Sequence, residues 1–203
     1  MKKRKYRLKQ RAARQQETRE RIVDAAVALH EELGPAATTI SALADRAGVQ
    51  RLTVYRHFQS EQEILKACSS KWLSRHPPPD VSKMKDREPV ERTRATFRAL
   101  YDYYSETQGM WNSLYRDLGK VAALDEAMSR FDEYLAALAE SVLGDWAPCK
   151  SKRLRATIGH ALRFSTWQSL KEQGLGRTAM AELVGSWIEA AGSRIKGKTN
   201  EIP

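Results

Sequence analysis

The chain has 203 residues and a formal net charge of +10, and 41% of its residues are hydrophobic. This length allows one medium domain, or a small domain joined to a larger one, with enough apolar residues for a core. The mean hydropathy of −0.60 and the absence of an apolar run near the ~20 residues of a spanning helix exclude an integral membrane protein. Because no apolar stretch follows the basic N-terminus, we expect no signal peptide, a cytoplasmic protein and no membrane partner.

Positive charge is concentrated at the N-terminus. Residues 1–21 carry ten Lys or Arg and two Glu, residues 22–76 carry six of each sign, and residues 77–203 carry nineteen basic and seventeen acidic residues. The net charges of these segments are therefore +8, 0 and +2. The excess defines a basic N-terminal arm over residues 1–17, which either is disordered or extends the following helix when bound. Such arms commonly bind polyanions, and the alternative is a solubilising tail.

An amphipathic helix is predicted over residues 18–33. Ile22, Ala26, Leu29 and Leu33 recur there at helical spacing, so they share one face of the helix. Gly34 and the proline after it end this helix, since neither residue favours its continuation.

Residues 38–65, TTISALADRAGVQRLTVYRHFQSEQEIL, predict a helix-turn-helix. Ala44 is small enough for two helices to approach closely, and Gly48 can adopt a positive φ without a Cβ clash. Val54 is an aliphatic residue placed to fill the angle between the two helices. Thr39 or Ser41 can cap the first of them, because a hydroxyl accepts from the unpaired N–H groups of a helix start.

The short helix after the turn, residues 50–58, is rich in side chains that hydrogen-bond to phosphates or base edges. These are Gln50, Arg51, Thr53, Tyr55, Arg56 and His57. A short polar helix with a buried aliphatic residue fits the major groove of double-stranded DNA. A solvated polar helix in a small helical domain is the alternative. The complete turn-helix pattern favours DNA binding.

The third helix is predicted to begin with a capping box and to end before a run of prolines. Ser60 and Glu63 have the S-x-x-E spacing of a capping box, which starts a helix to about Arg75. Three consecutive prolines at 77–79 stop it, because proline has no N–H for the helical ladder. We therefore place a domain boundary here.

The remainder of the chain also has helical spacing, and no period-two pattern of useful length indicates a strand. The expected fold class is all-α, with a helix-turn-helix domain over residues 18–76 and a second helical domain over residues 77–203. Apolar stripes predict helices near residues 90–104, 110–118, 124–142, 151–173 and 178–195.

Enzymatic and metal-binding patterns are missing from the sequence. It contains no GxGxxG after a strand, no GxxxxGK[ST], no GxSxG and no HExxH. Cys68 and Cys149 lie outside any CxxC or Cys/His cluster, which argues against a zinc site or a disulfide framework. Cys68 falls on an apolar helix face and is expected to be a buried thiol. We expect no enzyme, no catalytic residues, no metal site and no cofactor.

These motifs make the chain resemble the TetR family of bacterial transcriptional regulators, most closely over residues 18–72. TTISALADRAGV, TVYRHF and SEQEIL follow the pattern of that family. The resemblance implies a DNA-binding domain of three helices and about six further helices for ligand binding and dimerisation. It also implies that Thr39, Tyr55 and His57 bind phosphates, whereas Gln50, Arg51, Leu52 and Thr53 face base edges.

Two residues depart from the family pattern. Glu61 stands where the family usually has lysine, which removes a phosphate contact and brings a carboxylate near the DNA. Leu52 stands where many members have glycine or proline, and a leucine can instead pack against a thymine methyl group. Both changes alter the operator sequence that the helix would select.

The resemblance further implies a pocket for an unknown small-molecule effector in the helical domain. Apolar walls with a few polar groups suit such a ligand, although ordinary core packing is the alternative. Tyr104, His160 and Gln168 could supply the polar groups. The candidate lining residues are Phe97, Tyr101, Tyr104, Met110, Trp111, Leu114, Met128, Phe131, His160, Phe164, Trp167 and Gln168.

The last two predicted helices are expected to pair with those of a second subunit in a homodimer, as the resemblance implies. The candidate interface residues are Leu154, Ile158, Leu162, Leu183, Val184, Trp187 and Ile188. A dimer would place two reading helices about 34–36 Å apart on a palindrome. The predicted function is thus a repressor that a ligand releases from a palindromic operator. The alternatives are a constitutive DNA-binding or nucleoid-associated protein without an inducer and a helical protein–protein adaptor.

Overall fold

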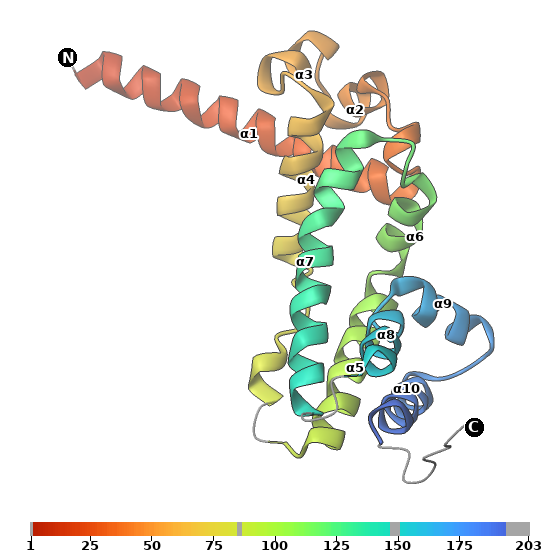
Figure 1. Ribbon diagram of the computed structural model, residues 1–203. Coiled ribbons are helices and arrows are strands. Elements are labelled where there is room, and N and C mark those ends of the chain that lie inside the picture. Colours follow the sequence, from red (N-terminus) through yellow and green to blue (C-terminus); the bar gives the residue numbers. More distant parts are fainter. Residues whose placement is uncertain (1, 85–86, 147–150, 194–203) are drawn as a thin grey trace, which may run out of the picture. The chain divides into compact units, whose positions relative to one another are not determined.

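The computed structural model describes residues 2–84, 87–146 and 151–193, and these ranges contain helices and no strand (Figure 1). The predicted all-α class is confirmed. The chain forms two compact units. One comprises Met1–Pro77 with Thr107–Arg130, and the other comprises Pro78–Glu106 with Phe131–Pro203. Cys149 and Ile195, the expected end of the last helix, lie outside the described residues.

The first unit contains the N-terminal helices and one helix from later in the chain. Its elements are α1 (Lys2–Glu32), η1 (Pro35–Ala37), α2 (Ile40–Ala47), α3 (Arg51–His57), α4 (Glu61–Arg75), α6 (Gln108–Asp117) and the start of α7 (Ala122–Asp145). Helix α1 packs against α2, α4 and α6, with Ile22, Ala26 and Leu29 buried as their spacing predicts. Leu33 is 45% exposed instead, because α1 ends at Glu32 before it. It begins sixteen residues earlier than the predicted start at residue 18, so the basic arm is the first half of a continuous helix.

The turns of this unit follow from a few local residues. Thr39, rather than Ser41, caps α2, because its Oγ1 accepts from the Ala42 N–H at 3.1 Å. Gly48 ends α2 with a φ of 63°, in the left-handed region predicted for it. Ser60 Oγ accepts from the Glu63 N–H at 3.2 Å, which confirms the predicted cap of α4.

The second unit consists of the remaining helices. Its elements are η2 (Val81–Met84), α5 (Pro89–Glu106), the rest of α7, α8 (Lys152–Ala161), α9 (Phe164–Glu172) and α10 (Arg177–Gly192). Helix α10 packs against α5 and α8. Aromatic side chains fill much of this core, including the fully buried Phe97, Tyr101, Tyr104, Phe164 and Trp167.

The prediction of a single helix over residues 151–173 is wrong, because the helix is interrupted between α8 and α9. Two buried hydroxyls donate to main-chain carbonyls at this interruption. Tyr101 donates to Ala161 O and Tyr104 donates to Leu162 O, both at 2.8 Å. Thr166 Oγ1 donates to His160 O at 2.6 Å. The two tyrosine hydroxyls replace the main-chain N–H partners that a continuing helix would supply, whereas His160 O also accepts from the Arg163 N–H at 3.2 Å.

Candidate nucleic-acid interface

Helix α3 presents its predicted DNA-binding side chains to solvent. Leu52 is 67% exposed and Tyr55 is 51% exposed, although both are large apolar or aromatic residues. Thr39, Gln50, Arg51 and Arg56 are exposed, while Thr53 and His57 are half-buried. All eight predicted side chains therefore reach the surface of the first unit.

The buried side of α3 explains why the opposite side faces outward. Val54 is 0% exposed and Phe58 is 1% exposed, so these two residues attach the short helix to the core. The guanidinium of Arg19 on α1 lies 4.5 Å from the centre of the Phe58 ring, a cation–π contact. A helix of this length would be unstable alone, and these contacts hold it.

The C-terminal end of α3 lies in a positive electrostatic environment. The pKa of His57 is lowered from its ordinary value, first by partial burial and then by the charges of Arg56 and Arg19. Arg56 also donates from Nη2 to Thr53 Oγ1 at 3.0 Å, which orients its guanidinium along the helix. A phosphate placed here would meet two cations and a neutral imidazole.

The starts of α2 and α4 differ in charge. Thr39 lies exposed at the N-terminus of α2, where unpaired N–H groups and the helix dipole favour an anion. Glu61 and Glu63 instead occupy the first turn of α4. Their carboxylates stabilise that helix start themselves, which gives a structural reason for the departure at Glu61.

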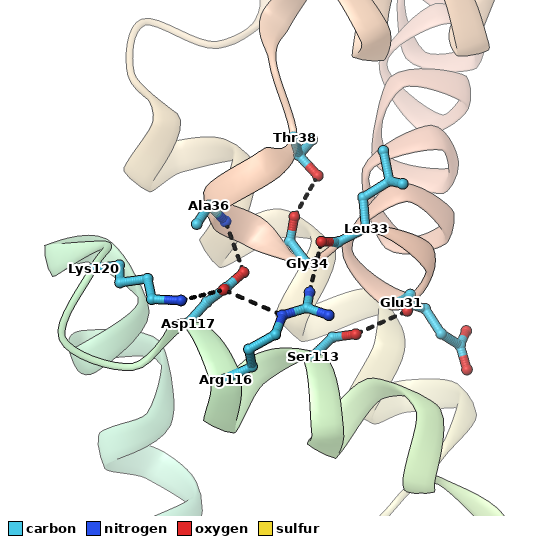
Figure 2. Close-up of polar contacts among 9 residues, drawn as sticks. All are labelled: Glu31, Leu33, Gly34, Ala36, Thr38, Ser113, Arg116, Asp117 and Lys120. Atoms are coloured by element: carbon cyan, nitrogen blue, oxygen red, sulfur yellow. Dashed lines mark hydrogen bonds and ion pairs between the residues drawn. The ribbon is translucent and has the colours of Figure 1, made fainter.

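Helix α6 holds the segment that leads from α1 into the helix-turn-helix, a set of contacts that the sequence did not predict (Figure 2). Asp117 Oδ2 accepts from the Ala36 N–H at 3.0 Å. Arg116 Nη2 donates to Leu33 O at 2.6 Å, and Ser113 Oγ donates to Glu31 O at 2.9 Å. Helix α6 thus satisfies the carbonyls of Glu31 and Leu33 at the end of α1 and the Ala36 N–H of η1.

Asp117 is the centre of this cluster, with 3% of its surface exposed. Burial raises the pKa of its carboxyl, but the Ala36 N–H, Arg116 and Lys120 outweigh that effect and hold the pKa below its ordinary value. Gly34, with a φ of 87°, passes so close that an added Cβ would lie 2.3 Å from Asp117 Oδ2. Only a glycine allows this approach. No local spacing in the sequence signals the cluster, because its partners are about eighty residues apart.

Comparison with known proteins agrees with this geometry. The model of the family described as "Bacterial regulatory proteins, tetR family" matches residues 22–68, which include α2, α3 and the turn between them. Residues 22–68 of this chain are thus similar to the N-terminal segment of TetR-family regulators.

Two curated relatives are similar to a short segment of this chain. The HTH-type transcriptional regulator SrpR of Pseudomonas putida is 43% identical over 56 residues, which cover 28% of this chain and 26% of SrpR. The uncharacterized HTH-type transcriptional regulator TtgW, from a strain of the same species, is 43% identical over 56 residues, 28% of this chain and 42% of TtgW. The chain therefore spans less than half the length of either relative.

A solved structure extends the likeness beyond the matched segment. A TetR-like transcriptional regulator from Rhodococcus sp. RHA1 superimposes with a TM-score of 0.62 and 19% sequence identity, and the match covers 85% of this chain and 93% of that one. At this identity the likeness concerns the fold, which is therefore that of TetR-type regulators over most of the chain.

The candidate ligand-binding residues are divided between the two units. Met110, Trp111, Leu114 and Met128 belong to the first unit, and the other eight belong to the second. Most are buried, but Leu114 and Gln168 are half-buried and His160 is exposed. The Tyr104 hydroxyl, a predicted polar group of the pocket, already donates to Leu162 O. Exposed His160 does not suit the enclosed position expected for it.

Five of the seven candidate interface residues are corrected by their burial. Each is at most 2% exposed within a single chain, and these residues are Leu154, Ile158, Leu162, Val184 and Ile188. Their stripes face the core of the second unit, so they are not available to a partner. Leu183 and Trp187 are half-buried and remain accessible.

Trp187 lies beside a shallow surface groove of about 490 Å³ on α8 and α10. The groove is lined by Arg153, Ala156, Thr157, His160, Trp187, Ala190 and Ala191. Sequence periodicity identified Trp187 but missed its neighbours on this surface, because small residues do not form a conspicuous apolar stripe.

In the described part of the chain, no helix combines the length and apolar character needed to cross a membrane. Among the same residues, no three His, Cys, Asp or Glu side chains are grouped to hold a metal ion.

Proposed function

We propose that this protein is a transcriptional repressor that binds a palindromic operator as a homodimer and is released from it by a small-molecule ligand. The observation that carries the proposal is the exposure of Arg51, Leu52 and Tyr55 on a helix held by buried Val54 and Phe58. A short, firmly attached helix with hydrogen-bonding side chains on its outer face suits the major groove. The match of residues 22–68 to the TetR family model supports a regulatory role.

Selection of bound fragments from sheared genomic DNA tests the proposal directly. We expect the full-length protein to enrich a small set of fragments that share a palindrome. The protein should then block transcription from a promoter that overlaps one of them. Uniform recovery of fragments would contradict sequence-specific binding and favour a nucleoid-associated protein, and failure to retain duplex DNA would favour a protein–protein adaptor.

The homodimer rests on the groove around Trp187. One α3 contacts few base pairs, whereas two copies related by a twofold axis read two half-sites of a palindrome. Trp187 is half-buried beside the small residues Ala156 and Ala190, an arrangement that lets a second copy approach closely. Tryptophan is also among the residues enriched at the energetic centres of interfaces.

The ligand is proposed to bind within the aromatic cluster of the second unit. Trp167 is 0% exposed, and its Nε1 has no hydrogen-bond partner among the described residues. The ring centroids of Tyr104 and Phe164 lie 6.0 and 5.1 Å from the ring centroid of Trp167. A buried indole N–H usually has a partner, so an apolar ligand with a carbonyl or carboxylate oxygen would satisfy it.

Thermal-shift measurements with matched compounds test this role for Trp167. A ligand of the folded state raises the melting temperature, and we expect 2-acetylnaphthalene to exceed its carbonyl-free analogue 2-ethylnaphthalene. The difference should disappear in Trp167→Phe, which keeps an aromatic ring and removes the N–H. A bound carbonyl compound that shifts both proteins equally would contradict the assignment. Release from DNA additionally requires that the ligand bind the two states with different affinities.

A further inference from the structure

A cationic surface lies between the first half of α1 and α3. It is a groove of about 1260 Å³. Among the described residues that line it, five are arginines and none is acidic. They are Arg7, Leu8, Gln10, Arg11, Ala12, Arg14, Gln15, Gln16, Thr18, Arg19, Thr53, Arg56 and His57. We call this surface the α1–α3 groove.

The arginines of the arm are placed on one side of α1 by helical spacing. Arg7, Arg11 and Arg14 stand at i, i+4 and i+7, so they share a face. From Arg7 to Arg19 the helix rises about 18 Å, at about 1.5 Å per residue. Phosphates follow one another by about 3.4 Å along each DNA strand, so this face can contact several of them.

The groove continues the predicted DNA-binding face of α3. Thr53, Arg56 and His57 belong to both the groove and the set of candidate DNA contacts. DNA that receives α3 in its major groove therefore brings its flanking phosphates to the mouth of the α1–α3 groove. The pKa of His57 is lowered first by its burial and then by the charges of Arg56 and Arg19, two of the arginines of this groove.

The helical form of the arm decides which part of the DNA it can contact. Helix α1 is continuous from Lys2 to Glu32, and Figure 1 shows its N-terminal half extending past α2, α3 and α4. With side chains a helix is about 10–12 Å wide, whereas the minor groove of B-DNA is about 6 Å wide. The intact helix does not enter that groove. Its arginines can meet the sugar-phosphate backbone.

We propose that the α1–α3 groove grips the sugar-phosphate backbone beside the half-site read by α3, through Arg7, Arg11 and Arg14. The arm thereby adds affinity that is independent of base sequence and sensitive to salt. This inference deepens the proposed function and rests on α3 being the DNA-reading helix.

The test compares salt dependence in two charge-matched variants of the full chain. One is R7Q/R11Q/R14Q, and the control is R98Q/R130Q/R163Q, which removes three exposed arginines outside the groove. Binding to a labelled 40-base-pair duplex of random sequence is measured by anisotropy from 50 to 300 mM KCl. Each lost phosphate contact should lower the slope of log K against log salt by about 0.9. We expect a decrease of about 2–3 per chain in the first variant and little change in the control.

A second variant separates lost charge from lost helix. R7K/R11K/R14K keeps the cations and should keep most of the salt dependence, while circular dichroism checks that the glutamine variant retains its helix. An unchanged slope in the helical glutamine variant would overturn the proposal, as would an equal decrease in the control.

The outcome is distinguishable from failure of the proposed function. Sequence preference is measured separately, as the affinity ratio between a selected fragment and the random duplex. If the wild-type protein shows no preference but the glutamine variant loses its salt slope, the operator hypothesis fails and the phosphate grip stands. If the wild-type protein shows sequence preference and the glutamine variant keeps the wild-type salt slope, only the proposal that the arm binds phosphates fails.

Discussion

Arg51 and Tyr55 stand four residues apart on the exposed side of α3, and their chemistry predicts different losses. An arginine recognises guanine through two hydrogen bonds in the major groove, whereas the Tyr55 hydroxyl is expected to contact a phosphate. We expect Arg51→Ala to cost about 1–3 kcal/mol on the operator and to relax sequence preference. Tyr55→Phe should weaken all duplexes by a similar factor.

Anisotropy titrations on a selected operator and on a scrambled duplex measure both effects. Arg98→Ala, which truncates an exposed arginine of the second unit, serves as the control and should leave both affinities unchanged. Wild-type affinities in Arg51→Ala and Tyr55→Phe would show that α3 does not read DNA.

His30 gives the first unit a dependence on pH. It is 6% exposed, its Nδ1 lies 3.3 Å from Cys68 Sγ, and burial lowers its pKa from 6.5 to about 4 against a weaker raising effect of Asp117. Because the folded state resists protonation, the unfolded state takes up a proton first as pH falls. The stability contributed by neutral His30 is full above the unfolded pKa and is lost between about pH 6.5 and 4, by about 3 kcal/mol.

Urea unfolding at several pH values measures this loss in the wild type and in His30→Gln, which does not titrate. We expect the wild-type free energy of unfolding to fall more steeply below pH 6.5 than that of the variant. Parallel curves would contradict a buried neutral imidazole. Cys68 adds nothing in this range, because burial raises its pKa to about 12.

The contact of α6 with the end of α1 predicts an effect on the helix-turn-helix. Asp117→Ala leaves the Ala36 N–H without its acceptor and removes the partner of Arg116 and Lys120. A hydrogen bond to a charged group contributes about 1.5–3 kcal/mol, and the bond from the Ala36 N–H is part-buried, so the free energy of unfolding should fall by about that amount.

Chemical denaturation checks this loss, with Asp132→Ala as a control because Asp132 is an exposed aspartate on α7. Asp117→Asn should lose less than Asp117→Ala, since the amide oxygen can still accept from Ala36. Equal stability of Asp117→Ala and Asp132→Ala would show that the cluster does not support η1.

Helices that depend on nearby residues were predictable from the sequence, and those that depend on distant ones were not. Gly48, Val54 and Ser60 act within a few residues of their partners, so the turn, the buried side of α3 and the cap of α4 were all anticipated. The break after α8 depends on hydroxyls of Tyr101 and Tyr104, about sixty residues away. No spacing within residues 151–173 carries that information.

The candidate site shows the same division. The exposed residues of α3 were identified because a motif of local spacing marks them. The interface stripes on α8 and α10 were misassigned because an apolar stripe fits a chain's own core as well as a partner. Ile158 and Val184 turn inward, whereas the accessible surface consists of Trp187 with small and polar neighbours.

The proposed dimer predicts that one charged residue introduced in place of Trp187 separates the subunits. The chain has a mass of 23.1 kDa, so twice that value, about 46 kDa, is expected for a homodimer. In Trp187→Glu a carboxylate would be buried between two copies, and the cost of burying an unpaired charge exceeds what a small interface supplies. Sedimentation should therefore detect a monomer.

The same substitution should weaken operator binding far more than random-duplex binding. A monomer contacts one half-site and loses the additional affinity of the linked second site, whereas its phosphate contacts per chain are unchanged. Ser169→Glu introduces the same charge at an exposed position of α9 and should remain dimeric and bind normally. If Trp187→Glu sediments as a dimer with wild-type operator affinity, the groove on α8 and α10 is not the interface, and two reading helices must be brought together by another surface.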